Sequence, residues 1–468
     1  MNKDALNYYS EILAFTLRLI YGYLLVSVLS MEADYWLYVA FTGITAFLAY
    51  GDLGFVSIAI KFFNSSFEYR SLKHFSATMY LGLLIAVLVS TFAIAVYVNP
   101  AIYYGDSDSF VDNELATLTM CVVVQSFSLV FKRILEGILR ADLYLAFYNL
   151  VNSGFFLVMI VYLLLVSCEY INMGVVLAIS FQSLLYLLVV GILVFRVWWI
   201  FRGDLVHVFS IDRMLFRRVI RMNSYAIIVT ISWFIYSELD RSLLTRVGDK
   251  VALEQLGVIL FFLGVSRPVI GIFTRQVPIK LNILVQSGGE GRTAFISSVV
   301  RSNFFWLTLF VSFLLEWSHP ILGFVSDIIV DKNILLLAIL GLIPTIYGTL
   351  YTSTIESYSL YKIGSVVAVT QSAIFVLLLM IFGINLYVLF VARAIMNTIF
   401  LLVYIWTVRS YNETTGLNLR VVMIFTLYML KSLWVGALVS SSLQVAILIS
   451  VSSAVILVLF NKKNLKLV

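Results

Sequence analysis

The chain has 468 residues, of which 62% are hydrophobic and only 12% are charged, and its mean hydropathy is +1.02. Soluble domains carry about 25% charged residues, so this composition excludes a soluble globular protein, a disordered chain and a secreted disulfide scaffold. The two cysteines, Cys121 and Cys168, are too few for a disulfide framework or a cysteine-based metal site.

Apolar runs between charged breaks predict about 14 transmembrane helices, since about 20 apolar residues in a helix span the hydrocarbon core of a bilayer. The predicted helices lie near residues 10–30, 35–60, 76–98, 115–137, 143–166, 172–195, 224–245, 254–275, 295–316, 333–355, 363–382, 384–408, 421–440 and 443–461. One apolar run, Ile363–Arg409, would be roughly 70 Å long as a single helix. It must therefore fold back, and Gly383-Ile384-Asn385 is the predicted turn. The fold class that we expect is an all-α polytopic membrane protein.

The basic residues orient the predicted helices. If the N-terminus is placed on one side, the loops on that side hold most of the 31 basic residues, and the opposite loops hold only Arg246, Lys250 and Lys332. Loops rich in lysine and arginine stay in the cytoplasm, so we expect both termini to be cytoplasmic and the acidic loop 106–114 to lie outside. The formal net charge of +6 then follows from topology and gives no indication of nucleic-acid binding.

An internal repeat divides the chain. The first six predicted helices match the next six when about 219 residues are added to each position. Because six crossings return the chain to its starting side, we expect two six-helix lobes related by a pseudo-two-fold axis along the membrane normal, with a substrate site between them. The predicted organisation is an N-terminal lobe (1–200), a cytoplasmic linker (201–223), a C-terminal lobe (224–410) and two further helices with a cytoplasmic tail (411–468).

Sequence motifs of known catalytic sites are missing. The chain has no phosphate-binding loop of the form G-x-x-x-x-G-K-[ST], and no H-E-x-x-H or G-x-S-x-G element. His74, His207 and His319 are scattered and form no metal-ligand cluster. The longest outer loop has about fifteen residues, which is little for sugar chemistry. We therefore expect no catalytic residue, no metal and no other cofactor, and thus a protein that is not an enzyme.

Three ionisable residues fall inside predicted spans at one depth. Arg18, Arg267 and Asp52 each lie roughly 12 Å from the cytoplasmic end of their helices. Charges at membrane depth are costly and mark functional sites, and the planar guanidinium of arginine suits phosphate. The trio therefore predicts a cationic cavity floor that binds an anionic headgroup, especially a pyrophosphate. The alternative is that Asp52 neutralises one arginine and the three residues only hold the bundle together.

Further embedded charges have less specific interpretations. Arg393 is predicted to be a second headgroup contact. Glu238, Asp240 and Arg241 cluster in one helix, where Glu238 and Arg241 have the i,i+3 spacing of a local ion pair. A coupling-ion role, for a proton or sodium, is the alternative for Glu238 and Asp240.

Two more groups of charges complete the set. Lys132, Arg133, Glu136 and Arg140 form an i,i+3 and i,i+4 ladder, which predicts a solvated helix face. Lys431 lies in the middle of a predicted span, where we expect it to meet a lipid carrier.

Short motifs resemble those of a known family. Gly51-Asp52-Leu53-Gly54-Phe55 is similar to the Asp-x-Gly element of Wzx-type (O-antigen) repeat-unit flippases, and the segments 239–244 and 137–141 also resemble that family. The family belongs to the multidrug/oligosaccharidyl-lipid/polysaccharide (MOP) exporter superfamily. The resemblance implies two six-helix lobes that move an undecaprenyl-pyrophosphate-linked oligosaccharide from the cytoplasmic to the periplasmic leaflet of a bacterial inner membrane. Related lipid II flippases carry arginines on helices 1, 2 and 8, whereas helix 2 here offers Asp52, which favours a different glycan.

The function that we expect is therefore a lipid-linked glycan flippase that works by alternating access. Its expected partners are the glycan carrier, membrane lipids, a coupling ion and polysaccharide polymerase machinery. A cation-coupled drug or small-molecule antiporter of the same superfamily is the first alternative. A membrane glycan polymerase or ligase and a major-facilitator carrier are less favoured, because the outer loops are short and the facilitator loop motif is missing after the second helix.

Overall fold

The structure, a computed structural model, describes most of the helical part of the chain. The described residues are 3–32, 34–49, 70–100, 103, 112–141, 145–170, 174–200, 228–229, 231–232, 235, 239–274, 292–357, 361–410, 427–435, 447 and 449–452. All regular secondary structure in these residues is helical, which confirms the all-α prediction. The predicted residues Asp52 and Glu238 lie outside the described residues.

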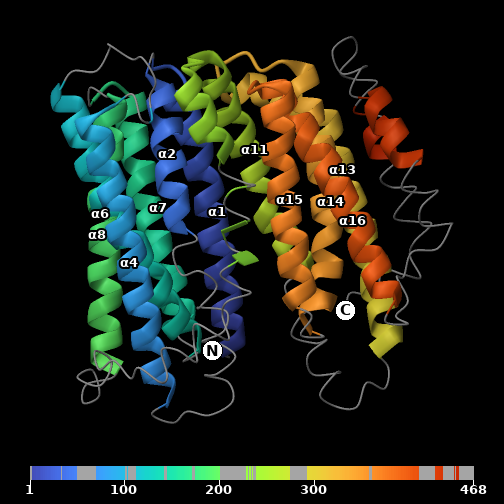
Figure 1. Cartoon of the computed structure of the whole chain (residues 1–468), viewed down its shortest axis with the longest axis horizontal. Coiled ribbons are helices and arrows are strands. Elements are labelled where there is room, and N and C mark those ends of the chain that lie inside the picture. The colour runs from blue at the N-terminus through green and yellow to red at the C-terminus, as the bar shows by residue number, and fades with distance from the viewer. Residues whose placement is uncertain are drawn as a thin grey trace. The chain divides into compact units, whose positions relative to one another are not determined.

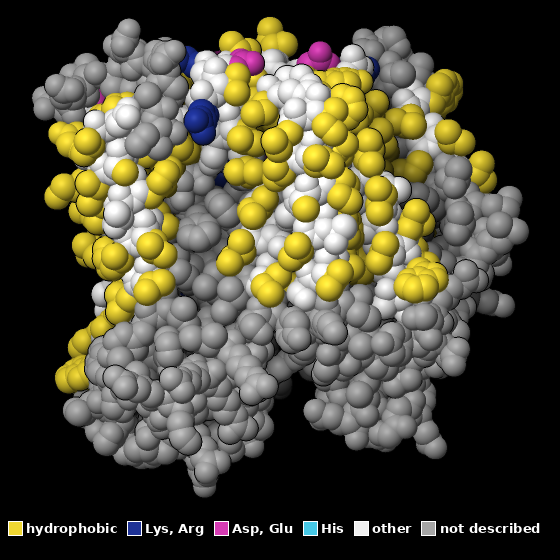
Figure 2. Space-filling view, in the orientation of Figure 1, with side chains coloured by type: hydrophobic (Ala, Val, Ile, Leu, Met, Phe, Trp, Pro, Cys, Tyr) yellow, Lys and Arg dark blue, Asp and Glu magenta, His cyan; other side chains and the backbone are white. Residues whose placement is uncertain are grey.

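Long helices make up most of the described residues. Their bounds are α1 Lys3–Leu29, α2 Tyr35–Ala49, α4 Arg70–Val98, α6 Asp112–Ala141, α7 Leu145–Ser167, α8 Val175–Ile200, α11 Lys250–Thr274, α13 Arg292–Val325, α14 Lys332–Ser357, α15 Tyr361–Phe382 and α16 Leu386–Ser410 (Figure 1). Within the described residues, seven helices are long and apolar enough to cross a membrane. Hydrophobic side chains also cover the described helices on the face shown in Figure 2. The chain is therefore a multi-pass membrane protein.

The predicted turn between α15 and α16 is confirmed. Gly383 has a φ of 84°, a left-handed conformation that glycine adopts without strain, and its N–H donates to the carbonyl of Leu379 at 3.0 Å. Asn385 then caps α16, because its side-chain oxygen accepts a hydrogen bond from the N–H of Val388 at 2.9 Å. These two residues end one span and begin the next.

The chain forms two compact units, Met1–Gly257 and Val258–Val468. The predicted lobe boundaries, with a linker at 201–223, stay a prediction. In the first unit, α1 packs on α7, and α6 packs on α4, α8 and α2. Polar contacts join these pairs, since Asn149 Nδ2 on α7 donates to Ser10 Oγ on α1 at 3.2 Å, and Gln125 Nε2 on α6 donates to Ser183 Oγ on α8 at 3.0 Å.

The residues after the predicted linker pack closely on α2. A Cβ atom added at Gly257 of α11 would lie 2.3 Å from Val39 Cγ2 and 3.0 Å from the Tyr35 hydroxyl. The ammonium of Lys250 lies 4.6 Å from the centre of the Trp36 ring, in a cation–π contact. The segment 239–257 thus belongs to the first compact unit through its contacts with α2.

In the second unit, α14 packs on α16, α13 and α15, and α15 also packs on α16. The predicted repeat is visible in the helix starts, because α6 begins at Asp112 and α14 at Lys332, close to the expected offset of about 219 residues. Buried polar groups again connect neighbouring helices. Asn397 Nδ2 on α16 donates to the carbonyl of Gly341 on α14 at 2.6 Å.

Candidate functional site

Arg18 is an exposed arginine within a membrane span. It lies in the apolar stretch Tyr9–Leu29 of α1, nine residues or roughly 14 Å along the helix from Tyr9. Among the described residues, no carboxylate forms an ion pair with its guanidinium. A charge at this depth costs about 3 kcal/mol when it faces lipid, which favours a position of Arg18 in contact with water or a polar group.

Lys132 on α6 is a second cation near Arg18. Its ammonium lies 5.1 Å from the ring centre of Tyr186 and 5.7 Å from that of Phe155, so two aromatic faces support it. It is half-buried, and Arg18 is close enough for the two charges to repel each other. The sequence predicted a solvated face here, and this was wrong for Lys132, because α8 and α7 place rings against it.

Tyrosines from three helices surround the two cations. Tyr21 on α1 packs on Phe156 with ring centres 5.6 Å apart, and its buried hydroxyl lies near that of Tyr38. The Tyr38 hydroxyl on α2 donates to Gln182 Oε1 on α8 at 3.5 Å. Tyr186, one turn further along α8, stacks on Phe155 at 4.6 Å. Phenol and amide groups of this kind can bind both phosphate and sugar hydroxyls.

The nearest carboxylate to Lys132 is already bound elsewhere. Glu136 Oε2 accepts a hydrogen bond from the buried Tyr148 hydroxyl at 2.7 Å and forms an ion pair with Arg133 Nη1 at 3.3 Å. Glu136 is buried, in contrast to the predicted solvated ladder. Of these four described charged residues, three are cations, Arg18, Lys132 and Arg133, and one is a carboxylate, Glu136.

The remaining predicted site residues either lie on other helices or have side chains outside the described residues. The backbone of Arg267 lies in α11 of the second unit, but its side chain is outside the described residues. Arg393 on α16 is half-buried, with its guanidinium carbon 5.9 Å from the Phe375 ring centre. Asp240 is fully buried, and its Oδ1 accepts a hydrogen bond from the backbone N–H of Arg241 at 2.9 Å. The structure thus places Lys132, which the sequence analysis had not included in the site, within electrostatic range of Arg18.

Solved structures of several membrane proteins share the fold of this chain. A solved structure described as "Lipid II flippase MurJ, inward closed conformation" matches with a TM-score of 0.70 at 15% identity, over 98% of this chain and 99% of that chain. An "inward-facing conformation of a multidrug resistance MATE family transporter of the MOP superfamily" matches with a TM-score of 0.56 at 14% identity, over 87% and 97%. A MOP superfamily transporter from Pyrococcus furiosus matches with a TM-score of 0.55 at 14% identity, over 87% and 95%. The chain therefore has the two-lobe MOP fold, as predicted.

The family is defined more closely by sequence. Residues 5–287 match the family described as "Polysaccharide biosynthesis protein", so the chain belongs to this family. The search of curated proteins found no match.

Proposed function

We propose that the chain is a flippase for a lipid-linked glycan. It moves an undecaprenyl-pyrophosphate-linked oligosaccharide repeat unit from the cytoplasmic to the periplasmic leaflet of a bacterial inner membrane by alternating access. The MOP fold and the membership in a polysaccharide biosynthesis family support a membrane transporter of this kind. The finer assignment to the Wzx type rests on the resemblance of the short motifs around Asp52 and Asp240.

The observation that carries the proposal is the pair of cations in the first unit. Arg18 lies inside the apolar stretch Tyr9–Leu29 and Lys132 at the end of the stretch Glu114–Arg133, within range for the two charges to repel each other. Neither forms a direct ion pair with a carboxylate of the described residues, although Glu136 attracts the Lys132 ammonium from further away. Glu136 offsets only part of this positive charge, so an anion bound between Arg18 and Lys132 would reduce their repulsion. A pyrophosphate supplies two adjacent negative groups, one for the fork of Arg18 and one for the ammonium of Lys132.

The other predicted residues extend this site in the proposal. Arg267 and Arg393 contribute further positive charge to the headgroup, and Asp52 selects among glycans. Glu238 and Asp240 are the proposed ion-coupling residues, for a proton or sodium. Both termini lie in the cytoplasm, and the protein acts beside the polymerase that consumes its product.

A complementation assay tests the headgroup role. In a strain that lacks the protein, we expect lipid-linked repeat units to accumulate on the cytoplasmic face, and the wild-type chain to restore surface glycan. Arg18→Ala, Lys132→Met and Arg267→Ala should each lower surface glycan by about tenfold, the effect of losing one charged contact. Arg246→Ala is the matched control, because Arg246 is exposed at the far end of its helix and loses the same charge. Normal glycan display by Arg18→Ala and Lys132→Met at normal protein levels would refute the proposal.

The second candidate is a cation-coupled drug antiporter. Its support is the fold shared with the MATE transporters. The two cations disfavour it, since a cationic substrate would be repelled by them. Deletion would then change the resistance of cells to cationic drugs and leave lipid-linked repeat units on their normal face. A polymerase, by contrast, would leave repeat units outside when deleted.

A further inference from the structure

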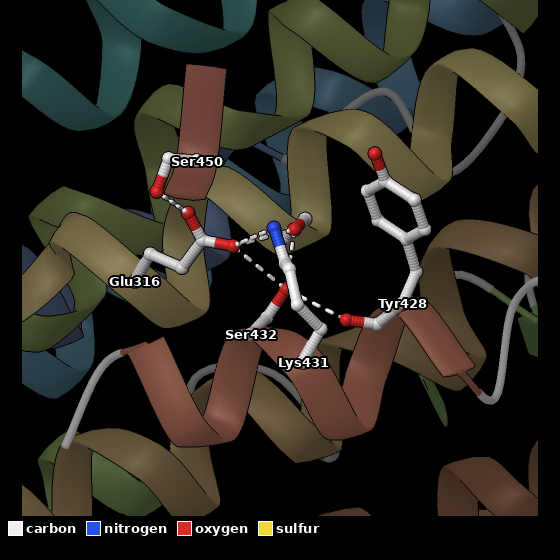
Figure 3. Close-up of polar contacts among 6 residues, drawn as sticks. Glu316, Tyr428, Lys431, Ser432 and Ser450 are labelled. Carbon is white, nitrogen blue, oxygen red and sulfur yellow. Dashed lines mark hydrogen bonds and ion pairs between the residues drawn. The ribbon is translucent and has the colours of Figure 1, made fainter. Parts of the chain in front are cut away.

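A second polar cluster lies in the unit Val258–Val468, within a membrane span. Its centre is Glu316 on α13, eleven residues after the start of the apolar stretch Phe305–Val325 and thus near the middle of the bilayer. Glu316 is buried, with only 4% of its surface exposed. Figure 3 shows side chains from three helical segments converging on this carboxylate.

Both oxygens of the Glu316 carboxylate are occupied. Ser312 Oγ, one turn earlier on α13, donates a hydrogen bond to Oε1 at 2.9 Å. Ser432 Oγ also lies 2.9 Å from Oε1 and shares its hydrogen between this oxygen and the carbonyl of Tyr428 at 2.8 Å. The ammonium of Lys431 forms an ion pair with the same oxygen, and Ser450 Oγ donates to Oε2. Three hydroxyls and one ammonium therefore satisfy a carboxylate that lipid could not solvate.

The two C-terminal segments turn their polar sides toward α13. In the segment 427–435, Tyr428, Lys431 and Ser432 form one stripe at helical spacing. The opposite stripe is apolar and exposed, as are the neighbours of Ser450. These exposed residues are Leu427, Leu430, Leu433, Trp434, Ile447 and Val451. Lipid gives no hydrophobic drive for helices to associate, so the polar cluster is what attaches the segments to α13.

The grouping of atoms resembles the ligand set of a small cation. A hard cation prefers oxygen ligands, and a carboxylate with three hydroxyls supplies five of them. A serine hydroxyl that donates to the carboxylate keeps lone pairs that can face a cation. Here the charge beside Glu316 is the Lys431 ammonium, which also lies 4.8 Å from the centre of the Tyr428 ring.

We propose that Glu316, Ser312, Ser432 and Ser450 form a site for a monovalent cation, and that Lys431 fills it with its own ammonium. The C-terminal segments therefore stay attached to α13 at any sodium concentration in the solution. This role differs from the sequence prediction that Lys431 meets a lipid carrier. It is independent of the headgroup site and does not require the proposed transport activity.

The test removes the Lys431 ammonium by substitution and supplies sodium in the solution instead. Purified full-length Lys431→Met is heated in NaCl or in N-methylglucamine chloride of equal ionic strength, and the midpoint of thermal unfolding is recorded. We expect sodium to raise the midpoint of this variant by about 2 °C or more. The wild type should not respond to sodium, because its site is filled, and the double variant Glu316→Gln/Lys431→Met should not respond either, because its carboxylate is gone.

Two results would overturn the proposal. One is an equal response to sodium in Lys431→Met and in the double variant, including no response in both. The other is a Lys431→Met protein that does not fold in sodium when the double variant does, since sodium would then be unable to replace the ammonium. Lys431→Arg, which keeps the charge, should behave like the wild type.

Discussion

At the scale of single residues, the buried charges of this chain fall into two kinds. Glu136 and Glu316 are each surrounded by donors from neighbouring helices, so their charges are compensated inside the protein. Arg18 forms no ion pair with a carboxylate of the described residues, and Lys132 is attracted by Glu136 without direct contact. The first kind stabilises the packing of helices. The second kind can attract and bind an anion that is not part of the protein.

Replacement of Glu136 should test the structural kind. Glu136→Ala leaves the buried Tyr148 hydroxyl without its acceptor, and we expect the free energy of unfolding to fall by about 2 kcal/mol. Arg133→Ala is the control, because the Arg133 side chain is 47% exposed and its ion pair should contribute under about 1 kcal/mol. Denaturant titration of the purified variants measures both changes. A larger loss for Arg133→Ala than for Glu136→Ala would contradict this assignment.

The sequence identified some of these residues and missed others for physical reasons. Arg18 stands alone in an apolar run, so its depth could be predicted from spacing. Lys132 lies in a charged ladder at the end of a span, and only the rings of Phe155 and Tyr186, which come from other helices, show that it is half-buried. Glu316 was missed because all its partners except Ser312 lie more than a hundred residues away in the sequence.

At the scale of the helices, the length of each apolar run in the sequence was enough to predict most of the spans. The predicted spans 363–382 and 384–408 correspond closely to α15 and α16, because Gly383 and Asn385 provide the turn between them. The close packing of α2 on α11 could not be predicted. It depends on which glycine faces which side chain, and α11 contains several glycines in a uniformly apolar sequence.

A methyl group at Gly257 should therefore weaken the contact between α2 and α11. In Gly257→Ala the new Cβ would clash with the branched side chain of Val39, and we expect a loss of about 1–3 kcal/mol in unfolding free energy. Gly264→Ala on the same helix is the matched control, since no atom of the described residues lies within 4 Å of its added Cβ. Thermal unfolding in detergent compares the two. Equal stability of both variants would show that α2 and α11 do not pack in this way.

At the scale of the whole molecule, the proposal depends on the direction of the chain across the membrane. The loop between α7 and α8 should face the periplasm if the basic loops are cytoplasmic. This loop contains Cys168, which is exposed, whereas Cys121 on α6 is buried. The two natural cysteines therefore offer a test of orientation without a new substitution.

We expect a membrane-impermeant maleimide added to spheroplasts to label the wild-type chain, and Cys168→Ser to remain unlabelled. Burial of Cys121 keeps it from reacting, so one labelled site is expected. Mass spectrometry of the labelled protein identifies the site. Labelling of Cys168 only after the membrane is permeabilised would reverse the proposed orientation.

The most direct test of the account is the affinity of the purified protein for a polyprenyl pyrophosphate, measured by native mass spectrometry. We predict that the wild type and the Arg246→Ala control bind it equally, and that Arg18→Ala and Lys132→Met each bind about tenfold more weakly. If both variants bind the pyrophosphate as tightly as the wild type does, the two cations do not hold the headgroup.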